Sequence, residues 1–406
     1  MAEKKKAPEP QKKSKILTLE EFQKKISAAD KAAIVDLNTK KPMDFIPTGS
    51  WVIDTLIGDG TMTGTPGGFP RGHIVEVFGD ESSGKTTLAL SICREAQELG
   101  GLPVFMDFEQ TFHPGYAEKM GINLAKNKFL VFQPNHFQHG ARLIKDSLSM
   151  KPLVIVCDSV SAMLPQQFLE GAIDDATRIG LQAQLMSGML SYITKYLKES
   201  NTCLVFTNQL RSVIKKSKYE GGPDEESSGG RALKFYSSVR LKLKKSTVEK
   251  IDVKSKITGK KGQEPVNVII KATVVKNKID KPYYTAPVYI RFGKGFDNIL
   301  SIIELAVNTN TIKKSGAFFT FEKNDKSIIK AQGKEQLWRM MDEDDKLCEA
   351  IQEKLTIVQD KEAKEEYVQF NENVEAGDEM EDMMTNIADN YIEKEKDKKI
   401  KKENDE

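Results

Sequence analysis

The stretch Gly79-Asp80-Glu81-Ser82-Ser83-Gly84-Lys85-Thr86-Thr87 fits the pattern G-x-x-x-x-G-K-[ST] of a phosphate-binding loop. Apolar residues 74–78 predict a short buried strand before it, and residues 88–96 predict a helix after it. The glycines let the backbone wrap an anion, and successive N–H groups at a helix N-terminus point at phosphate oxygens. Lys85 offers a positive charge to the β- and γ-phosphates, and Thr86 offers a hydroxyl to Mg²⁺. The stretch therefore predicts a nucleoside triphosphate site.

Apolar runs that predict strands recur between segments with helical periodicity, at residues 103–107, 129–133, 153–158, 203–207 and 239–243. Strands that alternate with helices are typical of a largely parallel sheet covered on both faces. Residues 266–275 and 288–292 predict further strands without long helices between them, which indicates an antiparallel edge. We therefore expect an α/β fold with a mainly parallel central sheet.

The rest of the chain divides by composition into segments. Residues 1–17 are a lysine-rich arm that we expect to be disordered, and residues 18–46 hold a predicted helix and linker for oligomerisation. Thr18-x-x-Glu21 is a capping box for that helix, which could equally dock on a partner or pack on its own core. The predicted core covers residues 47–299, and a small C-terminal α/β domain covers residues 300–358. Residues 359–406 form a charged, partly acidic tail.

Overall composition excludes several classes of protein. The formal net charge of the 406 residues is only +2, so a nucleic-acid site must rest on local charge. No run approaches ~18 apolar residues, and the N-terminus lacks the apolar region of a secretory signal. The four cysteines are far apart, which favours buried thiols in a reducing compartment over disulfides or zinc. We expect a cytoplasmic protein without a membrane segment.

Hydrolysis of a triphosphate on such a sheet requires a carboxylate for the metal and a group that orients or deprotonates water. Asp158 ends an apolar strand, where the metal carboxylate belongs. Glu109 ends another strand and is the candidate for water, although Asp107 competes for that role. Gln209 ends a third strand and could contact the γ-phosphate, or could simply terminate the strand.

Two basic segments suggest nucleic-acid binding. Residues 211–231 combine glycines with Arg211, three lysines and Arg231, although the acidic residues 224–226 also fit an ordinary solvated loop. Residues 240–245 place four basic side chains at a strand end, where a solvated edge strand is the alternative. His136-x-x-His139 has the spacing of metal ligands, but lacks neighbouring cysteines or carboxylates. We interpret these histidines as surface or helix-cap residues.

Several motifs together resemble the RecA family of ATP-dependent DNA strand-exchange recombinases, from about Pro47 to Leu355. The phosphate loop is one of them. The others are residues 105–109 followed by Pro114-x-Tyr116-Ala117, residues 156–160, residues 201–202 leading to Asn208-Gln209, Gly229-Gly230-x-Ala232-Leu233-Lys234-Phe235-Tyr236, and Val274-Val275-Lys276-Asn277-Lys278. The last two are more selective than a phosphate loop.

The resemblance implies ATP and Mg²⁺ as cofactors and a division of roles around the nucleotide. Lys85 and Glu109 would be catalytic, Tyr116 would stack on adenine, Asp158 and Thr86 would hold the metal, and Gln209 would switch between ATP and DNA. Lys276 and Lys278 would reach the γ-phosphate of a neighbouring subunit, so the site would be complete only in a filament. Phe292 stands where the family usually has a tyrosine at the nucleotide.

The resemblance also implies two loops at the central DNA, near residues 166–180 and 210–228, and a second DNA site. The DNA-binding residues it implies are Ile179, Ser187, Arg211, Val213, Ile214, Gly229, Gly230 and Arg231, with Lys244, Lys245 and Lys271 at the second site. The chain departs from the family at Gln184 and Ser191, where arginines are usual, and in longer loops. A phage-encoded member of the family would show such departures.

The resemblance implies a DNA-dependent ATPase that forms a filament on single-stranded DNA and exchanges strands with a homologous duplex, in recombination and DNA repair. The expected partners are single-stranded DNA, homologous double-stranded DNA and further copies of the chain, with single-strand-binding and loader proteins as additional ones. A ring-forming helicase-type motor on the same core is the alternative. A mediator that binds nucleotide without hydrolysis is less consistent with Lys85, Asp158 and Glu109.

Overall fold

A computed structural model describes Thr18, Glu21, Lys24, Lys25 and residues 43–58, 67–171, 175–212, 225–227, 229–254 and 261–355. The chain forms two compact units, Met1–Asp44 and Phe45–Glu406. In the first, Thr18 N donates to Glu21 Oε2 over 3.0 Å and Glu21 N donates to Thr18 Oγ1 over 3.3 Å. These reciprocal bonds confirm the predicted capping box. The basic arm, most of the N-terminal helix and the charged tail lie outside the described residues.

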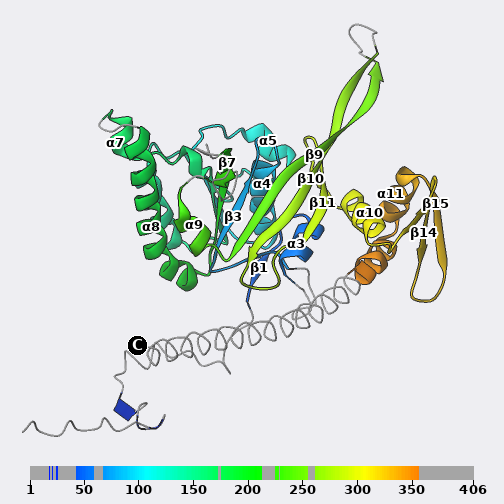
Figure 1. The fold of residues 1–406 in the computed structure, drawn as a ribbon, viewed down its shortest axis with the longest axis horizontal. Helices are drawn as coiled ribbons and strands as arrows, with labels where there is room; N and C mark the ends of the chain where they lie inside the picture. Colours follow the sequence, from blue (N-terminus) through cyan, green and yellow to red (C-terminus); the bar gives the residue numbers. More distant parts are fainter. Residues whose placement is uncertain are drawn as a thin grey trace, which may run out of the picture. The chain divides into compact units, whose positions relative to one another are not determined.

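A ten-stranded sheet organises the second unit (Figure 1). Five strands run parallel: β3 (Ile74–Gly79), β4 (Pro103–Asp107), β5 (Leu130–Phe132), β6 (Val154–Asp158) and β7 (Cys203–Ser212). β9 (Val239–Lys254) lies parallel to β3. β10 (Lys261–Asn277), β11 (Thr285–Arg291) and β12 (Gly295–Asp297) follow it as an antiparallel edge. The strand order β12-β11-β10-β9-β3-β7-β6-β4-β5 confirms the predicted α/β fold class.

Alternating side chains of the sheet build one hydrophobic core on each face. Val75 and Val77 of β3 pack with α3 (Trp51–Ile57), α4 (Lys85–Glu98) and α10 (Asn298–Asn308). Ile74 points to the other face, where α6 (Phe137–Leu148), α8 (Asp175–Ser200) and α9 (Arg231–Tyr236) cover the sheet. Two covered faces explain why strands β3, β4 and β6 are buried along their whole length.

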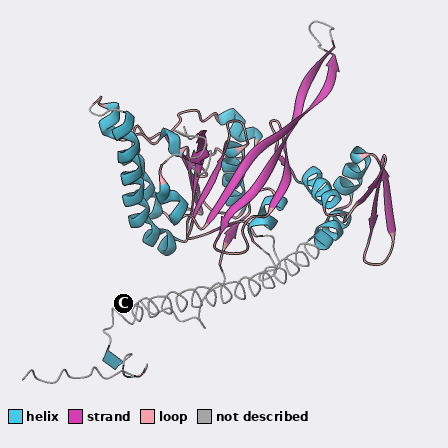
Figure 2. Cartoon of the chain, viewed as in Figure 1, coloured by secondary structure: helices cyan, strands magenta, loops and turns pink. Residues whose placement is uncertain are grey.

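Strands β9 and β10 are much longer than the predicted runs 239–243 and 266–275. They pair from Val239–Asn277 to Lys254–Lys261, so the ribbon extends well beyond its neighbours in the sheet (Figure 2). β3 accompanies β9 only as far as Leu243. Beyond that point, Lys244 to Thr247 are exposed before Val248 packs on the core again, so the buried apolar alternation is interrupted. The shorter prediction was wrong because it relied on buried apolar alternation.

The C-terminal part of the second unit contains β13 (Lys313–Ser315), β14 (Phe318–Glu322), β15 (Ile328–Gln332) and α11 (Lys334–Glu343). α11 ends before Asp344, and helical structure resumes at residue 345. Asp344 Oδ1 accepts from Lys346 N and Leu347 N at 3.1 and 3.3 Å, which caps the next helix. None of the helices in the described part of the chain has the length and apolarity to cross a membrane.

One buried carboxyl group makes stability depend on pH. Asp54 in α3 is only 4% exposed, and its Oδ1 accepts from Thr48 N over 2.8 Å. Burial raises the pKa of Asp54 from 3.8 to about 8, against the opposing effect of the hydrogen bonds with Thr48. The folded state therefore retains a proton between about pH 4 and pH 8 that the unfolded state releases, and stability falls as pH rises through this window.

We predict that Asp54→Asn removes this pH dependence, because asparagine keeps the acceptor for Thr48 without a titratable charge. Wild type and variant should unfold at similar denaturant concentrations near pH 5. At pH 9 the variant should be more stable by ~2–5 kcal/mol. Urea unfolding at several pH values measures this difference. Parallel pH profiles for both proteins would contradict the assignment.

Candidate functional site

The predicted phosphate loop connects β3 to α4 at the carboxyl edge of the parallel strands. Gly84 has φ +89°, and a Cβ there would lie 2.5 Å from Ile290 Cδ1 in β11. A Cβ on Gly79 would lie 1.9 Å from Leu243 O in β9. Both positions therefore require glycine, one for its backbone conformation and both for space. Ser83 Oγ donates to Asp80 O over 2.8 Å, which closes the loop on itself.

Lys85 and Thr86 begin α4 and point into the loop. Lys85 Nζ donates to Gly79 O over 3.0 Å and to Asp80 O over 2.5 Å. Burial lowers the pKa of Lys85, and the carboxylates of Asp158 and Glu109 oppose that shift. The ammonium group is thus held within the curve of the loop, where a phosphate would supply the stronger counter-charge.

Asp158, the last residue of β6, lies beside the phosphate loop and contacts Thr86. Thr86 Oγ1 donates to Asp158 Oδ2 over 2.8 Å, and Thr207 of β7 donates to Asp158 Oδ1. Asp158 is 6% exposed, and burial raises the pKa of its carboxyl group despite both hydrogen bonds. A buried carboxylate beside a hydroxyl forms the hard oxygen donor set that Mg²⁺ prefers, so these residues fit that ion.

Two carboxylates lie at the end of β4, and their surroundings differ. Asp107 is 1% exposed, and its oxygens accept from Thr111 N, Phe112 N and Gln133 Nε2 at 3.0–3.2 Å. It therefore fixes the turn after the strand. Glu109 is exposed and accepts from Ser159 Oγ over 2.5 Å. Only Glu109 has the access that a water-orienting group needs.

Gln209 of β7 lies on the same edge as Glu109. Its Nε2 is 3.5 Å from Glu109 Oε1, at the limit of a hydrogen bond. Residues from β4, β6 and β7 are thus brought together with the loop of β3, because carboxyl ends of parallel strands share one edge. The arrangement can clamp a triphosphate, hold a cation and place a carboxylate near the terminal phosphate.

Two aromatic residues flank this edge. Tyr116 in α5 (Pro114–Lys119) is half-buried, and its hydroxyl is 3.3 Å from Thr87 Oγ1. Phe292 directly follows β11, two residues after the Ile290 that packs on Gly84, and is 52% exposed. Both rings therefore have a place beside the phosphate loop that suits a base.

Lys276 and Lys278 lie away from the carboxyl edge, toward the amino ends of the parallel strands. Lys278 N donates to Ser238 O, and Ser238 N donates to Ile74 O, the first residue of β3. Lys276 Nζ donates to Lys234 O and Phe235 O at the end of α9, over 2.7 and 3.0 Å. Lys278 is thus level with the first residue of β3, about 17 Å along the strand from the phosphate loop. Lys276 is level with Glu76, about 10 Å along the strand from Gly79 and two strands away from β3.

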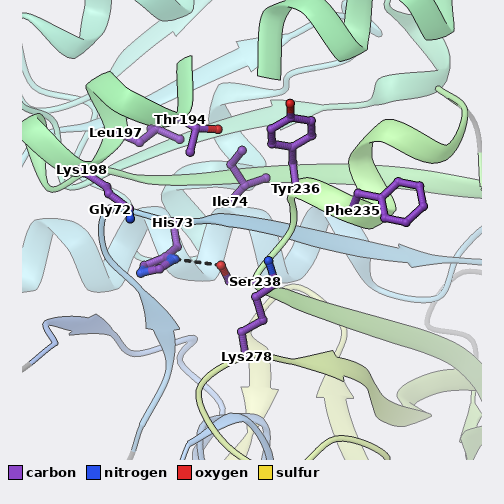
Figure 3. A pocket seen from close by; sticks show the side chains of 10 residues that line it. All are labelled: Gly72, His73, Ile74, Thr194, Leu197, Lys198, Phe235, Tyr236, Ser238 and Lys278. Carbon is purple, nitrogen blue, oxygen red and sulfur yellow. Dashed lines mark hydrogen bonds between the residues drawn. The ribbon is translucent and has the colours of Figure 1, made fainter. Parts of the chain in front are cut away.

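A cavity of about 460 Å³ lies at the amino end of β3, beside Lys278 (Figure 3). Figure 3 shows Lys278, just after β10, and Ser238, just before β9, below Phe235 and Tyr236 of α9. His73 bonds Ser238 Oγ through Nδ1 over 2.8 Å, and Phe235 is 70% exposed. The exposed ring of Phe235 therefore lies beside Lys276 and Lys278.

The predicted DNA-binding residues on α8 lie on its exposed side. Ile179 is 57% exposed, and Ser187 is also exposed, together with Gln184 and Ser191. The opposite side of the helix packs into the core through Met186, Leu190, Ile193 and Leu197. The exposed side of the helix thus has Gln184 and Ser191 at the two positions where the resemblance implies arginines.

Around the second predicted loop, the structure describes only the flanks. Arg211 pairs with Glu226 of β8 (Glu225–Ser227) in an antiparallel ladder, while Val213 and Ile214 lie outside the described residues. Gly229 and Gly230 have φ +84° and +73°, and added Cβ atoms would meet Val160 and Ala183 at 2.8 and 2.7 Å. These glycines are therefore needed for the turn and its packing. Arg231 begins α9 and is exposed.

Two of the three lysines assigned to a second DNA site face each other on the ribbon, and Lys245 follows Lys244 on the other face. Lys244 lies directly opposite Lys271, and Lys245 lies opposite Ile270. All three side chains are exposed. Two like charges directly opposite each other destabilise a sheet. Their juxtaposition indicates a surface suited to a polyanion.

His136 and His139 cap α6, as predicted. His136 Nδ1 accepts from His139 N over 3.2 Å, and His139 Nδ1 accepts from Asn135 N over 3.4 Å. No cluster of three or more metal-ligating side chains is present among the residues that the structure describes. All four cysteines are free thiols, and three of them are buried.

Sequence reasoning missed several polar groups around the site. Ser159 and Thr207 hold Glu109 and Asp158, and Glu76 of β3 bonds Asn208 and Arg240. A polar residue within an apolar strand, such as Glu76 in Ile74-Val75-Glu76-Val77-Phe78, was the available signal. Its partners come from strands far apart in the chain, so the signal did not identify them.

Comparison with known proteins agrees with this geometry. Residues 16–297 match the RecA N-terminal domain and residues 300–360 match the RecA C-terminal domain. The chain is 38% identical to Protein RecA of Thermus aquaticus over 317 residues, which cover 78% of this chain and 86% of that protein. It is 36% identical to Protein RecA of Porphyromonas gingivalis over 359 residues, 87% and 97% of the two chains. The chain therefore belongs to the RecA family.

Proposed function

We propose that the protein is a DNA-dependent ATPase that assembles on single-stranded DNA and exchanges strands with a homologous duplex, in recombination and DNA repair. The observation that carries this proposal is the separation of Lys276 and Lys278 from the phosphate loop of their own chain. A lysine side chain extends about 6 Å. This is too short for Lys278 to cross the length of β3, and too short for Lys276 to cover about 10 Å along the strand and two strand spacings across the sheet. The two lysines can therefore serve a phosphate only on a neighbouring copy.

Each residue at the carboxyl edge has a role in such a reaction. Lys85 and the loop N–H groups bind the β- and γ-phosphates, and Glu109 orients the attacking water. Ser159 holds Glu109 in place through a hydrogen bond. Thr86 and Asp158 would hold Mg²⁺, which neutralises charge on the phosphate oxygens when bound. Tyr116 and Phe292 would flank the base.

Assembly and hydrolysis are then linked. Copies stacked head to tail would bring the edge with Lys276 and Lys278 against the next copy's phosphate loop. Such heterologous contacts produce open helical filaments unless the rotation closes a ring. The lysines would stabilise charge that develops on the γ-phosphate, as an arginine finger supplied by a partner does. A lone protomer should hydrolyse ATP slowly.

The ring-forming motor is the weaker alternative. It shares the phosphate loop and Asp158, but it does not account for the match to both RecA domains. We also place the protein in the cytoplasm, where free thiols such as Cys93, Cys157 and Cys203 persist. Single-strand-binding and loader proteins are the further partners that we propose.

A strand-exchange assay tests the function directly. With ATP and Mg²⁺, the protein should convert single-stranded circles and homologous linear duplex to joint molecules, and heterologous duplex should give none. Negative-stain electron microscopy of the same mixtures should show helical filaments. Closed rings, together with ATP turnover that does not respond to single-stranded DNA, would support the motor instead.

We predict that two inactive variants restore each other when mixed. Glu109→Gln should lower turnover by about 10²–10⁴-fold while retaining ATP binding, and Lys276→Ala/Lys278→Ala should also be inactive on DNA. In an equimolar mixture, about one interface in four joins an intact Glu109 to intact lysines. Turnover should therefore recover to about a quarter of wild type. No recovery in co-assembled filaments would show that the lysines do not act across the interface.

We predict that Lys244→Thr weakens DNA binding and leaves the fold intact. Removing one of two opposed charges should change stability by only ~0.2–0.5 kcal/mol, in the favourable direction. Affinity for a second, duplex DNA should fall, and the slope of log affinity against log salt should decrease by about 1. Fluorescence anisotropy at several salt concentrations measures both. Lys128→Thr, an exposed lysine far from the ribbon in sequence, is the control, and an equal loss in both variants would contradict a local site.

A further inference from the structure

A buried carboxylate in the central strand joins two parts of the sheet that the proposed function uses separately. Glu76 of β3 is 0% exposed. Its Oε1 accepts from Asn208 Nδ2 over 2.9 Å, and its Oε2 accepts from Arg240 Nε over 2.5 Å. A carboxylate removed from water requires such partners, and each carboxylate oxygen of Glu76 has one.

On one side, this network reaches the nucleotide edge. Asn208 of β7 accepts from Gln209 N through Oδ1 over 2.9 Å, so the same amide group connects Gln209 to Glu76. The side chain of Gln209 lies 3.5 Å from Glu109 Oε1. A movement of Gln209 toward a γ-phosphate therefore acts on the group that holds Glu76.

On the other side, the network reaches the lysine pair. Arg240 lies opposite Glu76 in β9 and opposite Lys276 in β10, and its guanidinium stacks over the ring of Phe78 at 4.5 Å. Burial lowers the pKa of Lys276, and the charges of Lys278 and Arg240 lower it further. Arg240 thus lies close enough to influence the lysine electrostatically.

We propose that Glu76 is a positioning residue that couples the nucleotide edge of each protomer to the lysines serving the next protomer. This proposal rests on the proposed function, since it assumes that Lys276 and Lys278 act across an interface. Glu76 cannot exchange a lost partner for water, because it is fully buried. A shift of Asn208 must therefore move Glu76 and Arg240. Arg240 would in turn move Lys276, which lies opposite it in β10.

The consequence is communication along an assembled filament. Binding of ATP in one protomer would alter the placement of the lysines that complete the neighbouring site. ATP turnover should then respond cooperatively to ATP concentration and strongly to DNA. A purely structural ion pair would affect stability and leave these responses unchanged, so the two roles can be distinguished.

Two variants test the coupling at different points. Asn208→Ala cuts the connection to Gln209 and keeps the Glu76–Arg240 pair. Glu76→Gln disturbs both connections. The control is Arg291→Gln, which breaks the ion pair of Arg291 with Asp297 in the same sheet, where neither residue belongs to the network. For each protein, turnover with and without single-stranded DNA is measured against ATP concentration, with thermal unfolding as the measure of fold.

Both network variants should lose stimulation by DNA at least fivefold and should lose ATP cooperativity, within the usual range of about 5–150-fold for coupling between sites. Their turnover without DNA should stay within about twofold of wild type. Arg291→Gln should lose stability only. Should Glu76→Gln fail to fold, Asn208→Ala alone decides.

A folded Asn208→Ala protein with wild-type stimulation and cooperativity would overturn the coupling, as would equal losses in Arg291→Gln. These outcomes are distinct from failure of the proposed function. In that case the wild-type protein itself would show no response to DNA, or the mixed variants of Glu109 and the lysines would not restore each other.

Discussion

The length of β3 is the constraint on which the rest of the structure depends. The strand ends in the phosphate loop at Gly79 and begins at Ile74, beside Ser238 and the backbone of Lys278. A strand is stiff along its axis, so it holds these two edges apart by a fixed distance. The phosphate loop and Lys278 of one chain therefore lie too far apart to contact the same phosphate.

Burial on both faces makes this separation rigid. The side chains of β3 enter two different cores, and the neighbouring strands β7 and β9 pair with it in register. Within this apolar strand, Glu76 is the polar exception, and its burial is tolerated only because Asn208 and Arg240 satisfy it. The strand that separates the two edges thus also contains the group that connects them.

Sequence reasoning recovered the elements whose physics is local. The strand, loop and helix around Gly79–Thr87 follow from glycine spacing and apolar periodicity, and the capping box follows from two residues three apart. The choice between Asp107 and Glu109 could not be made in this way, because it depends on Gln133 and on the backbone of Phe112. The length of β9 could not be predicted from the sequence either, because the exposed residues 244–247 interrupt the buried alternation that marks a strand.

Lys276 and the pair Lys244 and Lys271 show two ways in which a folded chain can accommodate positive charge. Lys276 offsets its charge by capping the carbonyl end of α9, so it is stable before any partner arrives. Lys244 and Lys271 have each other as cross-strand neighbours, so their charges repel unless an anion offsets them. The first arrangement suits a group that must be presented in one position to a small target. The second suits a surface that must accept a continuous backbone of phosphates regardless of its sequence.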